Sequence, residues 1–183
     1  MLQGKTVNLR VVEKEDLPLV AEWFNDPEFS GEYDPLDEQQ TGTDVERRYD
    51  NLSPEAKWFV IEKKDGGKIG FIGNFLVGRL QEVGYALVSN ERNKGFGTEA
   101  VKIMVDYLFL SKDIVRIQAG TNVENKPSQR VLEKAGFTRE GIVRKEMFVR
   151  GKWIDFYRYS ILREEWKKPK ILDNQSSQRQ NEK

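Results

Sequence analysis

A run of residues near the middle of the chain has the composition of an anion-binding turn. Residues 92–100 read Arg-Asn-Lys-Gly-Phe-Gly-Thr-Glu-Ala, between an apolar stretch typical of a strand and another typical of a helix. The first-turn N–H groups of a helix have no intrahelical partners, and the macrodipole places partial positive charge there. Gly95 and Gly97 let a ligand approach the backbone, while Arg92 and Lys94 add positive charge. The pattern predicts a pyrophosphate site.

The spacing of the glycines narrows the kind of pyrophosphate site. The turn lacks the ending of a Walker loop, and it fits the dinucleotide fingerprint only with Ala100 in place of the third glycine. It resembles instead the acyl-CoA loop of the GNAT N-acetyltransferase superfamily, R/Q-x-x-G-x-G/A, at Arg92, Gly95 and Gly97. The resemblance implies that this loop binds the pyrophosphate of acetyl-CoA, at the residues Arg92, Asn93, Lys94, Gly95, Phe96, Gly97 and Thr98. ATP or NAD is the alternative occupant.

A second motif lies downstream and carries a hydroxyl. The superfamily commonly ends its core with N-x-x-S/A, a short helix and Gly-Phe, which this chain matches at Asn125, Ser128 and 136–137. Helical spacing places Ser128 on the same face as Val131, Leu132 and Ala135. Its hydroxyl can therefore face a cleft, or it can bond a backbone carbonyl one turn back.

The resemblance also assigns the rest of the cofactor site. It implies that the strand before the loop splays from its neighbour and bonds the pantetheine arm through the backbone of Leu87 and Val88. Asn125 would bond the arm from the opposite side. A backbone N–H near Val88 would then polarise the thioester carbonyl as an oxyanion donor.

Composition excludes several chemistries and partners. The chain has no histidine and no cysteine, so the commonest general base, the commonest zinc ligand and a thiol nucleophile are missing, and no metal is expected. Thirty basic residues balance thirty acidic ones, which favours neither nucleic acid nor a membrane surface as a partner. With no signal peptide and no apolar run long enough to span a bilayer, we expect a cytoplasmic enzyme.

Acid–base work must then fall to other side chains. Glu82, at the start of the strand that leads into the loop, is our first choice as general base; a cross-strand ion pair is its alternative role. Glu146 and Asp155 are second choices. Many superfamily members protonate the leaving thiolate with a tyrosine, but Leu132 occupies that position here. Ser128 is the remaining hydroxyl, unless the thiolate leaves unassisted.

The elements that must position these residues form an α/β (α+β) pattern. We expect one domain over 1–166 and a polar, disordered C-terminal tail over 167–183. The GNAT resemblance implies a mixed, mostly antiparallel central sheet that is splayed at the acyl-CoA site and flanked by helices. The periodicity predicts strands at 5–12, 58–62, 68–77, 81–88, 114–119, 138–149 and 152–162, and helices at 17–24, 43–52, 98–110 and around Ser128. Between the first helix and the sheet, 29–52 is either a substrate-side lid or a plain connection.

The acceptor is predicted less directly. The start of the chain (5–17), Asn25-Asp26-Pro27 and the late hairpin resemble the ribosomal-protein-type N-acetyltransferases, which implies acetyl transfer to a primary amine, with a protein N-terminal α-amine preferred. A small amine such as a polyamine or an antibiotic is the first alternative, and a non-catalytic CoA-binding module is the second. Either a monomer or a homodimer is compatible with the sequence. Aromatic residues that could line the amine pocket are Tyr33, Tyr85, Phe148, Trp153 and Tyr157, and carboxylates suited to a polycation are Asp34, Asp37, Glu38, Asp44 and Glu46.

Overall fold

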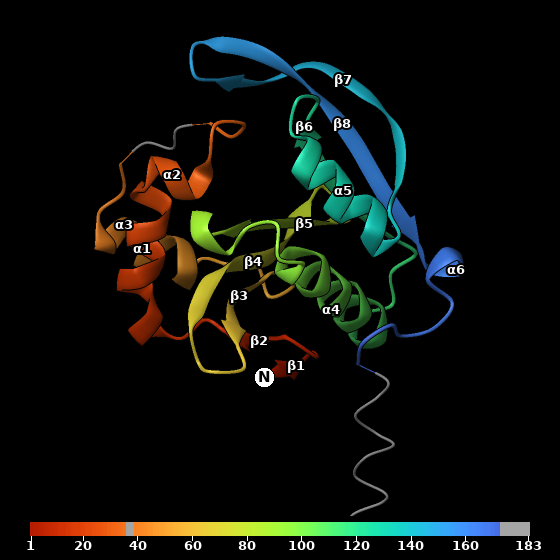
Figure 1. The fold of residues 1–183 in the computed structure, drawn as a ribbon, viewed down its shortest axis with the longest axis horizontal. Helices are drawn as coiled ribbons and strands as arrows, with labels where there is room; N and C mark the ends of the chain where they lie inside the picture. The colour runs from red at the N-terminus through yellow and green to blue at the C-terminus, as the bar shows by residue number, and fades with distance from the viewer. Residues whose placement is uncertain (36–38, 173–183) are drawn as a thin grey trace, which may run out of the picture.

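One mixed β-sheet runs through the chain in the computed structural model, which describes residues 1–35 and 39–172 (Figure 1). The strands lie in the order β1-β2-β3-β4-β5-β6-β8-β7. They are β1 Leu2–Gln3, β2 Val7–Val11, β3 Lys57–Lys63, β4 Lys68–Val77, β5 Leu80–Leu87, β6 Arg116–Asn122, β7 Thr138–Val149 and β8 Lys152–Leu162. The helices are α1 Leu17–Asn25, α2 Pro27–Ser30, α3 Gly42–Asp50, α4 Phe96–Ser111, α5 Lys126–Ala135 and α6 Arg163–Trp166, with short 3-10 turns at Lys14–Asp16 and Ser89–Glu91.

The sheet opens between its two parallel strands. β5 pairs with β6 at Gln81–Ile117 and Glu82–Gln118, and β5 then continues to Leu87 without further pairing to β6 in the described chain. β6 instead follows β8 in antiparallel register along its whole length. All other neighbouring strands are antiparallel. The predicted mostly antiparallel α/β sheet is therefore confirmed, and it has a splay beyond Glu82.

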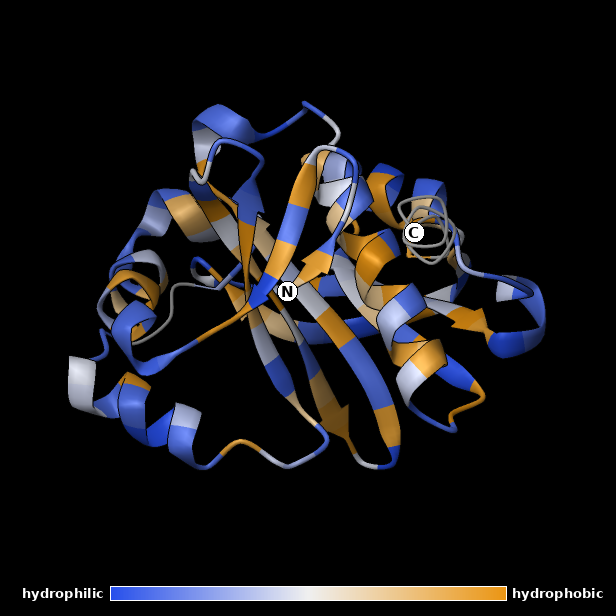
Figure 2. Cartoon of the chain, turned by 90° about the horizontal axis from the view of Figure 1, so that it is seen from below, coloured by the Kyte–Doolittle hydropathy of each residue, from blue (hydrophilic) through white to orange (hydrophobic). Residues whose placement is uncertain are grey.

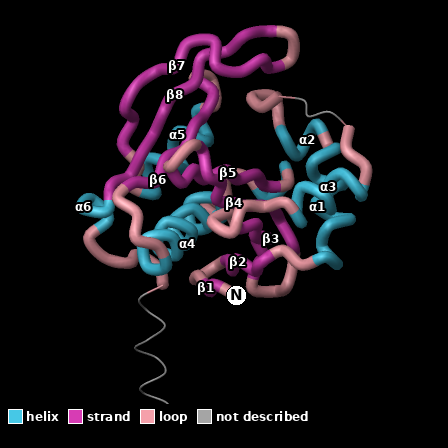
Figure 3. Tube along the Cα trace, turned by 180° about the vertical axis from the view of Figure 1, so that it is seen from behind, coloured by secondary structure: helices cyan, strands magenta, loops and turns pink. Residues whose placement is uncertain are grey.

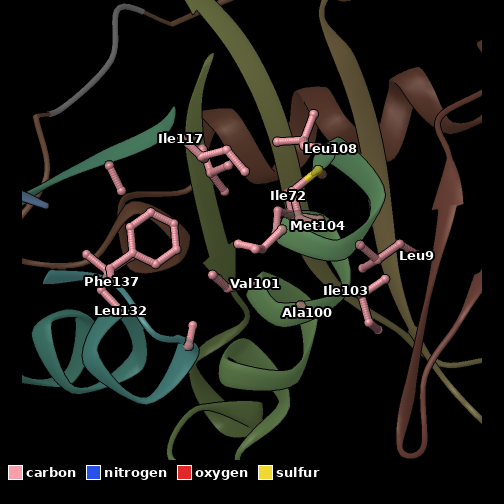
Figure 4. Close-up of a cluster of buried hydrophobic side chains, with 14 of the residues drawn as sticks. Leu9, Ile72, Ala100, Val101, Ile103, Met104, Leu108, Ile117, Leu132 and Phe137 are labelled. Atoms are coloured by element: carbon pink, nitrogen blue, oxygen red, sulfur yellow. The ribbon is translucent and has the colours of Figure 1, made fainter. Parts of the chain in front are cut away.

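Helices cover both faces of the sheet because its central strands, β3 and β4, carry buried side chains on both sides. Figure 2 shows apolar and polar residues interleaved along the strands, and Figures 1 and 3 show α4 and α5 on one side and α1 to α3 on the other. Side chains of α4 such as Val101 and Met104 point toward Ile72 and Ile117 of the sheet (Figure 4). All four are fully buried. The opposite face is packed by α1 and α3 around Trp58.

The proline after α1 has two roles. α1 ends at Asn25, because a residue that precedes proline is disfavoured in the helical conformation. Pro27 then begins α2, because its missing N–H costs nothing in a first turn, and the Asp26 side chain accepts a hydrogen bond from the Glu28 N–H as N-cap. This short helix places the segment 27–35 beside the splay.

The described chain continues past Trp166 and returns to α4. The buried carboxylate of Asp106 accepts hydrogen bonds from Trp166 Nε1 and from the backbone N–H groups of 170–172. These residues of the predicted tail are thus tied to the domain, and the prediction for 173–183 lies outside the described residues. Within the described ranges, no helix is long and apolar enough to cross a membrane.

Candidate active site

A cavity of about 900 Å³ opens at the splay of the sheet. One wall is the segment 27–35 after α1, and the other is the first turn and outer face of α5. Its floor is β5 from Val83 to Leu87, and one end is the turn at 92–98 that leads into α4. The two motifs found in the sequence therefore line the same cavity.

The turn before α4 has the backbone geometry of an anion site. Gly95 is the N-cap of α4 with a φ of +90°, in the left-handed region that favours glycine. At Gly97, an added Cβ would lie 3.6 Å from Leu87 Cδ1 and 3.8 Å from Tyr85 and Val131. The helix start therefore packs closely on β5, and its first turn lines the cavity, where the sequence predicts a pyrophosphate.

The two cations of the loop have protein partners. Arg92 donates from Nε to the Leu87 carbonyl at 2.9 Å, and from Nη2 to the carbonyls of Glu28 and Phe29 at 2.6 and 2.9 Å. Lys94 pairs with Glu91 at 2.9 Å. Arg92 therefore joins the cofactor loop to α2, and its predicted contact with pyrophosphate stays a prediction.

The direction of the backbone along β5 distinguishes Leu87 from Val88. The Val88 N–H donates to the Ile69 carbonyl at 3.0 Å and so completes the pairing with β4. Because successive N–H groups of a strand point to opposite sides, the Leu87 N–H faces the splay. Of these two N–H groups, that of Leu87 faces the splay, whereas that of Val88 is bonded to β4 and does not point to the predicted oxyanion position.

A pair of hydroxyls lies on the α5 side of the splay. The Tyr85 hydroxyl lies 3.0 Å from Ser128 Oγ, and the Ser128 N–H donates to Asn125 Oδ1 at 3.0 Å, which caps α5. Burial raises the pKa of Tyr85, which keeps the phenol protonated near neutral pH. Leu132 is buried in the core, so the position of the family's tyrosine is apolar here. The alternation of Val83, Tyr85 and Leu87 places Tyr85 on the apolar face of β5, but its contact with Ser128 depends on how α5 packs on the sheet.

The candidate base lies at the vertex of the splay on the other face of the sheet. Glu82 Oε2 accepts a hydrogen bond from Gln118 Nε2 at 2.8 Å and pairs with Arg158 at 3.1 Å. Arg158 also pairs with Glu146. The cross-strand ion pair considered as an alternative for Glu82 is thus present, and it brings two of the three candidate carboxylates together. The third, Asp155, accepts the Lys145 N–H at 2.8 Å.

Charge is divided along the cavity wall. The segment 27–35 contributes Glu28, Glu32 and Asp34, whereas α5 contributes Arg130 and Lys134. The basic end suits phosphates, and the acidic end suits an ammonium group.

Two of the five aromatic residues expected in the amine pocket lie at the cavity, and three lie elsewhere. Tyr33 and Tyr85 line the cavity. Phe148 and Trp153 contact each other on the exposed hairpin, and Tyr157 lies beneath Arg139. The amine pocket can therefore draw on the first two, which are the aromatic residues of this set at the cavity wall.

The chain is similar to known acetyltransferases over most of its length. The family model "Acetyltransferase (GNAT) domain" matches residues 6–138. An uncharacterized N-acetyltransferase, p20, of Bacillus licheniformis is 32% identical over 174 residues, 90% of this chain and 97% of that protein.

Solved structures are similar as well. The spermidine N-acetyltransferase from Vibrio cholerae in complex with CoA and spermine superposes with a TM-score of 0.78 and 23% identity, over 88% of this chain and 98% of that one. The ribosomal-protein-S5-alanine acetyltransferase from Vibrio fischeri gives a TM-score of 0.75 and 25% identity, over 90% and 97%.

Family, fold and site agree. The loop at 92–98, the splay of the sheet and the α5 start occupy one cavity, and the family model covers all three. The chain belongs to the GNAT acetyltransferase family and is an acetyl-CoA-dependent enzyme that transfers an acetyl group to an amine.

Proposed function

We propose that the acceptor is the α-amine of a protein N-terminus. The observation that carries the proposal is the state of the base: Glu82 is held by Arg158 and Gln118, and the chain contains no histidine. An α-amine has a pKa of about 7.7–8.0 and a lysine amine about 10.4, so the α-amine is already partly neutral near pH 8. Such an acceptor requires the least help in losing its proton.

The groups that would accept the ammonium proton and stabilise the leaving sulfur lie on opposite faces of the sheet. Glu82 lies on the face covered by α1, where it would accept the ammonium proton directly or through water. Tyr85 and Ser128 lie on the α4 and α5 face, where their hydroxyls would hydrogen-bond the leaving sulfur. The Leu87 N–H would polarise the thioester carbonyl.

The cofactor would be bound at two places, its pyrophosphate at the turn before α4 and its pantetheine arm at the start of α5. The N–H groups from Asn93 to Thr98 would bind the pyrophosphate, with Arg92 and Lys94 at the rim. Asn125, whose Oδ1 caps α5, would bond the pantetheine arm. The similarity to the ribosomal-protein-S5-alanine acetyltransferase supports an N-terminal acceptor for this arrangement.

A small polyamine is the second candidate acceptor. The observation in its favour is the acidic wall of Glu28, Glu32 and Asp34. Two other carboxylates expected to serve a polycation have structural roles, because Asp44 caps α3 with Thr41 and Glu46 pairs with Lys14. Asp37 and Glu38 lie outside the described residues.

A comparison of matched acceptors tests the proposal. The kcat/KM for a peptide with a free N-terminus is compared with that of the same peptide, N-terminally blocked and carrying lysine, and with that of spermidine, by following free thiol release. We expect the free N-terminus to react fastest, with a rate that rises from about pH 6 and levels near the acceptor's own pKa. Faster turnover of the lysine peptide or of spermidine would exclude the proposed acceptor.

A further inference from the structure

One guanidinium near the cavity is shared by two carboxylates. Arg158 Nη1 lies 3.1 Å from Glu82 Oε2, and Arg158 Nη2 bonds Glu146 Oε1. The side chains of Glu82 and Glu146 are 25% and 18% exposed, so water screens their charges only in part. Gln118 adds a neutral donor to Glu82. The cluster therefore carries one more negative than positive charge.

A bulge in β7 brings Glu146 to this cluster. Val143 pairs with Phe156 and Met147 pairs with Ile154, so residues 144–146 stand opposite Asp155 alone. Lys145, with a φ of +50°, turns the strand and donates its N–H to Asp155. Bulges of this kind redirect a side chain, and here Glu146 is turned toward Arg158 while most of β7 is exposed.

One oxygen of Glu146 has no visible structural role. Glu146 Oε2 is buried and has no hydrogen-bond partner among the described residues. Buried polar atoms usually have a hydrogen-bond partner, so this oxygen adds no bond to the fold among the described residues. Its remaining effect is the charge that it places on Arg158.

The cluster adjoins the cavity floor. Gly84, two residues after Glu82, and Gly120, two residues after Gln118, both line the cavity. Gly120 pairs with Arg158 across β6 and β8, and an added Cβ at Gly120 would lie 3.0 Å from Arg158 Nη1. A change of charge on this guanidinium is therefore felt at the vertex where the amine would lose its proton.

We propose that Glu146 is a positioning residue that preserves the basicity of Glu82 through Arg158. If Arg158 were paired with Glu82 alone, its positive charge would stabilise the ionised carboxylate and make Glu82 a weaker base. The negative charge of Glu146 on the same guanidinium offsets part of this effect, so Glu82 keeps its capacity to accept a proton. Two neutral residues also adjoin Glu82: Gln118 from β6 bonds its carboxylate, and Phe75 stands opposite it on β4. The inference rests on the proposed role of Glu82 as base.

The test measures the titration of Glu82 itself. The carboxyl carbons are labelled with ¹³C, and the Glu82 signal is assigned by its loss in Glu82→Gln. In Glu146→Gln, which keeps the shape of the side chain, the midpoint of the Glu82 titration is expected to fall by about one pH unit. The kcat is expected to fall about tenfold, with an unchanged Kd for acetyl-CoA. An unchanged midpoint would overturn the inference.

Three further variants separate positioning from folding. Glu146→Asp keeps the charge and is expected to hold the midpoint closer to that of the wild type. In the Arg158→Gln background, Glu146→Gln is expected to lose its effect, because the effect passes through Arg158. Glu140→Gln is the matched control, since Glu140 lies on the same strand and pairs with Arg116 outside the cluster. A shift of similar size in Glu140→Gln would also overturn the inference.

The titration of Glu82 does not depend on which amine is the acceptor. If spermidine proves to be the preferred substrate, the N-terminal proposal fails while the titration still reports on Glu146. If Glu82→Gln keeps full kcat, the role of Glu82 as base fails whatever the acceptor.

Discussion

The carboxylate of Asp106 should be among the most sensitive single positions for stability. It is fully buried in α4 and accepts hydrogen bonds from Trp166 Nε1 at 2.8 Å and from the N–H groups of Lys170, Ile171 and Leu172 at 2.8, 2.7 and 3.2 Å. In Asp106→Asn one oxygen becomes an NH2 group, which faces N–H donors and cannot accept from them. The variant also removes the charge that strengthens the remaining bonds.

The hydrogen bonds to Asp106 set an upper limit on the lost stability, and relaxation of the chain reduces it. Each hydrogen bond to a charged group contributes about 1.5–3 kcal/mol, so the intact set would exceed 6 kcal/mol if nothing relaxed. The segment after Trp166 can detach and bond water instead, which limits the loss to the free energy of docking it. We expect the free energy of unfolding to fall by about 3 kcal/mol. For a domain of this size that lowers Tm by about 6–12 °C.

Thermal unfolding and amide hydrogen exchange measure the two parts of this prediction. The N–H groups of 170–172 should lose protection in Asp106→Asn, whereas α4 should keep most of its own. Asp113→Asn is the matched control, because Asp113 lies in the connection after α4 and is exposed. A loss below about 1 kcal/mol, or unchanged protection at 170–172, would refute the reasoning that this carboxylate anchors the segment.

Three further predictions concern the site and the response to pH. Gly97→Ala should weaken acetyl-CoA binding at least tenfold in calorimetry. Its Tm should be unchanged or higher, because an added Cβ meets no protein atom closer than 3.6 Å. Unchanged affinity would show that the pyrophosphate does not bind at this turn. Tyr85→Phe and Ser128→Ala should each lower kcat ten- to a hundredfold with an unchanged KM for acetyl-CoA, and full activity in both would show that the leaving thiolate needs no hydroxyl. Hydrogen bonds from Arg10 and Lys68 hold the pKa of Asp16 well below its usual range, so its carboxylate stabilises the fold above the unfolded pKa of about 4. The stability lost in Asp16→Asn should therefore be largest above about pH 5 and shrink steadily as the pH falls below about 4 in urea titrations. A pH-independent difference would contradict this.

The cofactor loop could be predicted from sequence because all of its signals are local. A strand, two glycines and a helix start follow each other within 83–100, and the structure places them as the pattern indicates. The destination of Arg92 was not local: its guanidinium bonds carbonyls of α2, 63 and 64 residues away. The bulge in β7 was equally hidden, since it depends on register against β8 and on a positive φ at Lys145, for which a lysine gives no signal.

The proposed separation of acid and base chemistry depends on the parity of one strand. Glu82 and Tyr85 are three residues apart on β5, and an odd separation puts their side chains on opposite faces of the sheet. The register is fixed by pairing with β4, where Phe75 stands opposite Glu82 and Ile72 opposite Tyr85. A slip of one residue would move Glu82 to the α4 face and bring Gln81 or Val83 to Arg158 in its place. Binding of the cofactor arm in the splay does not depend on this parity, whereas the proposed transfer of two protons from two faces of the sheet does.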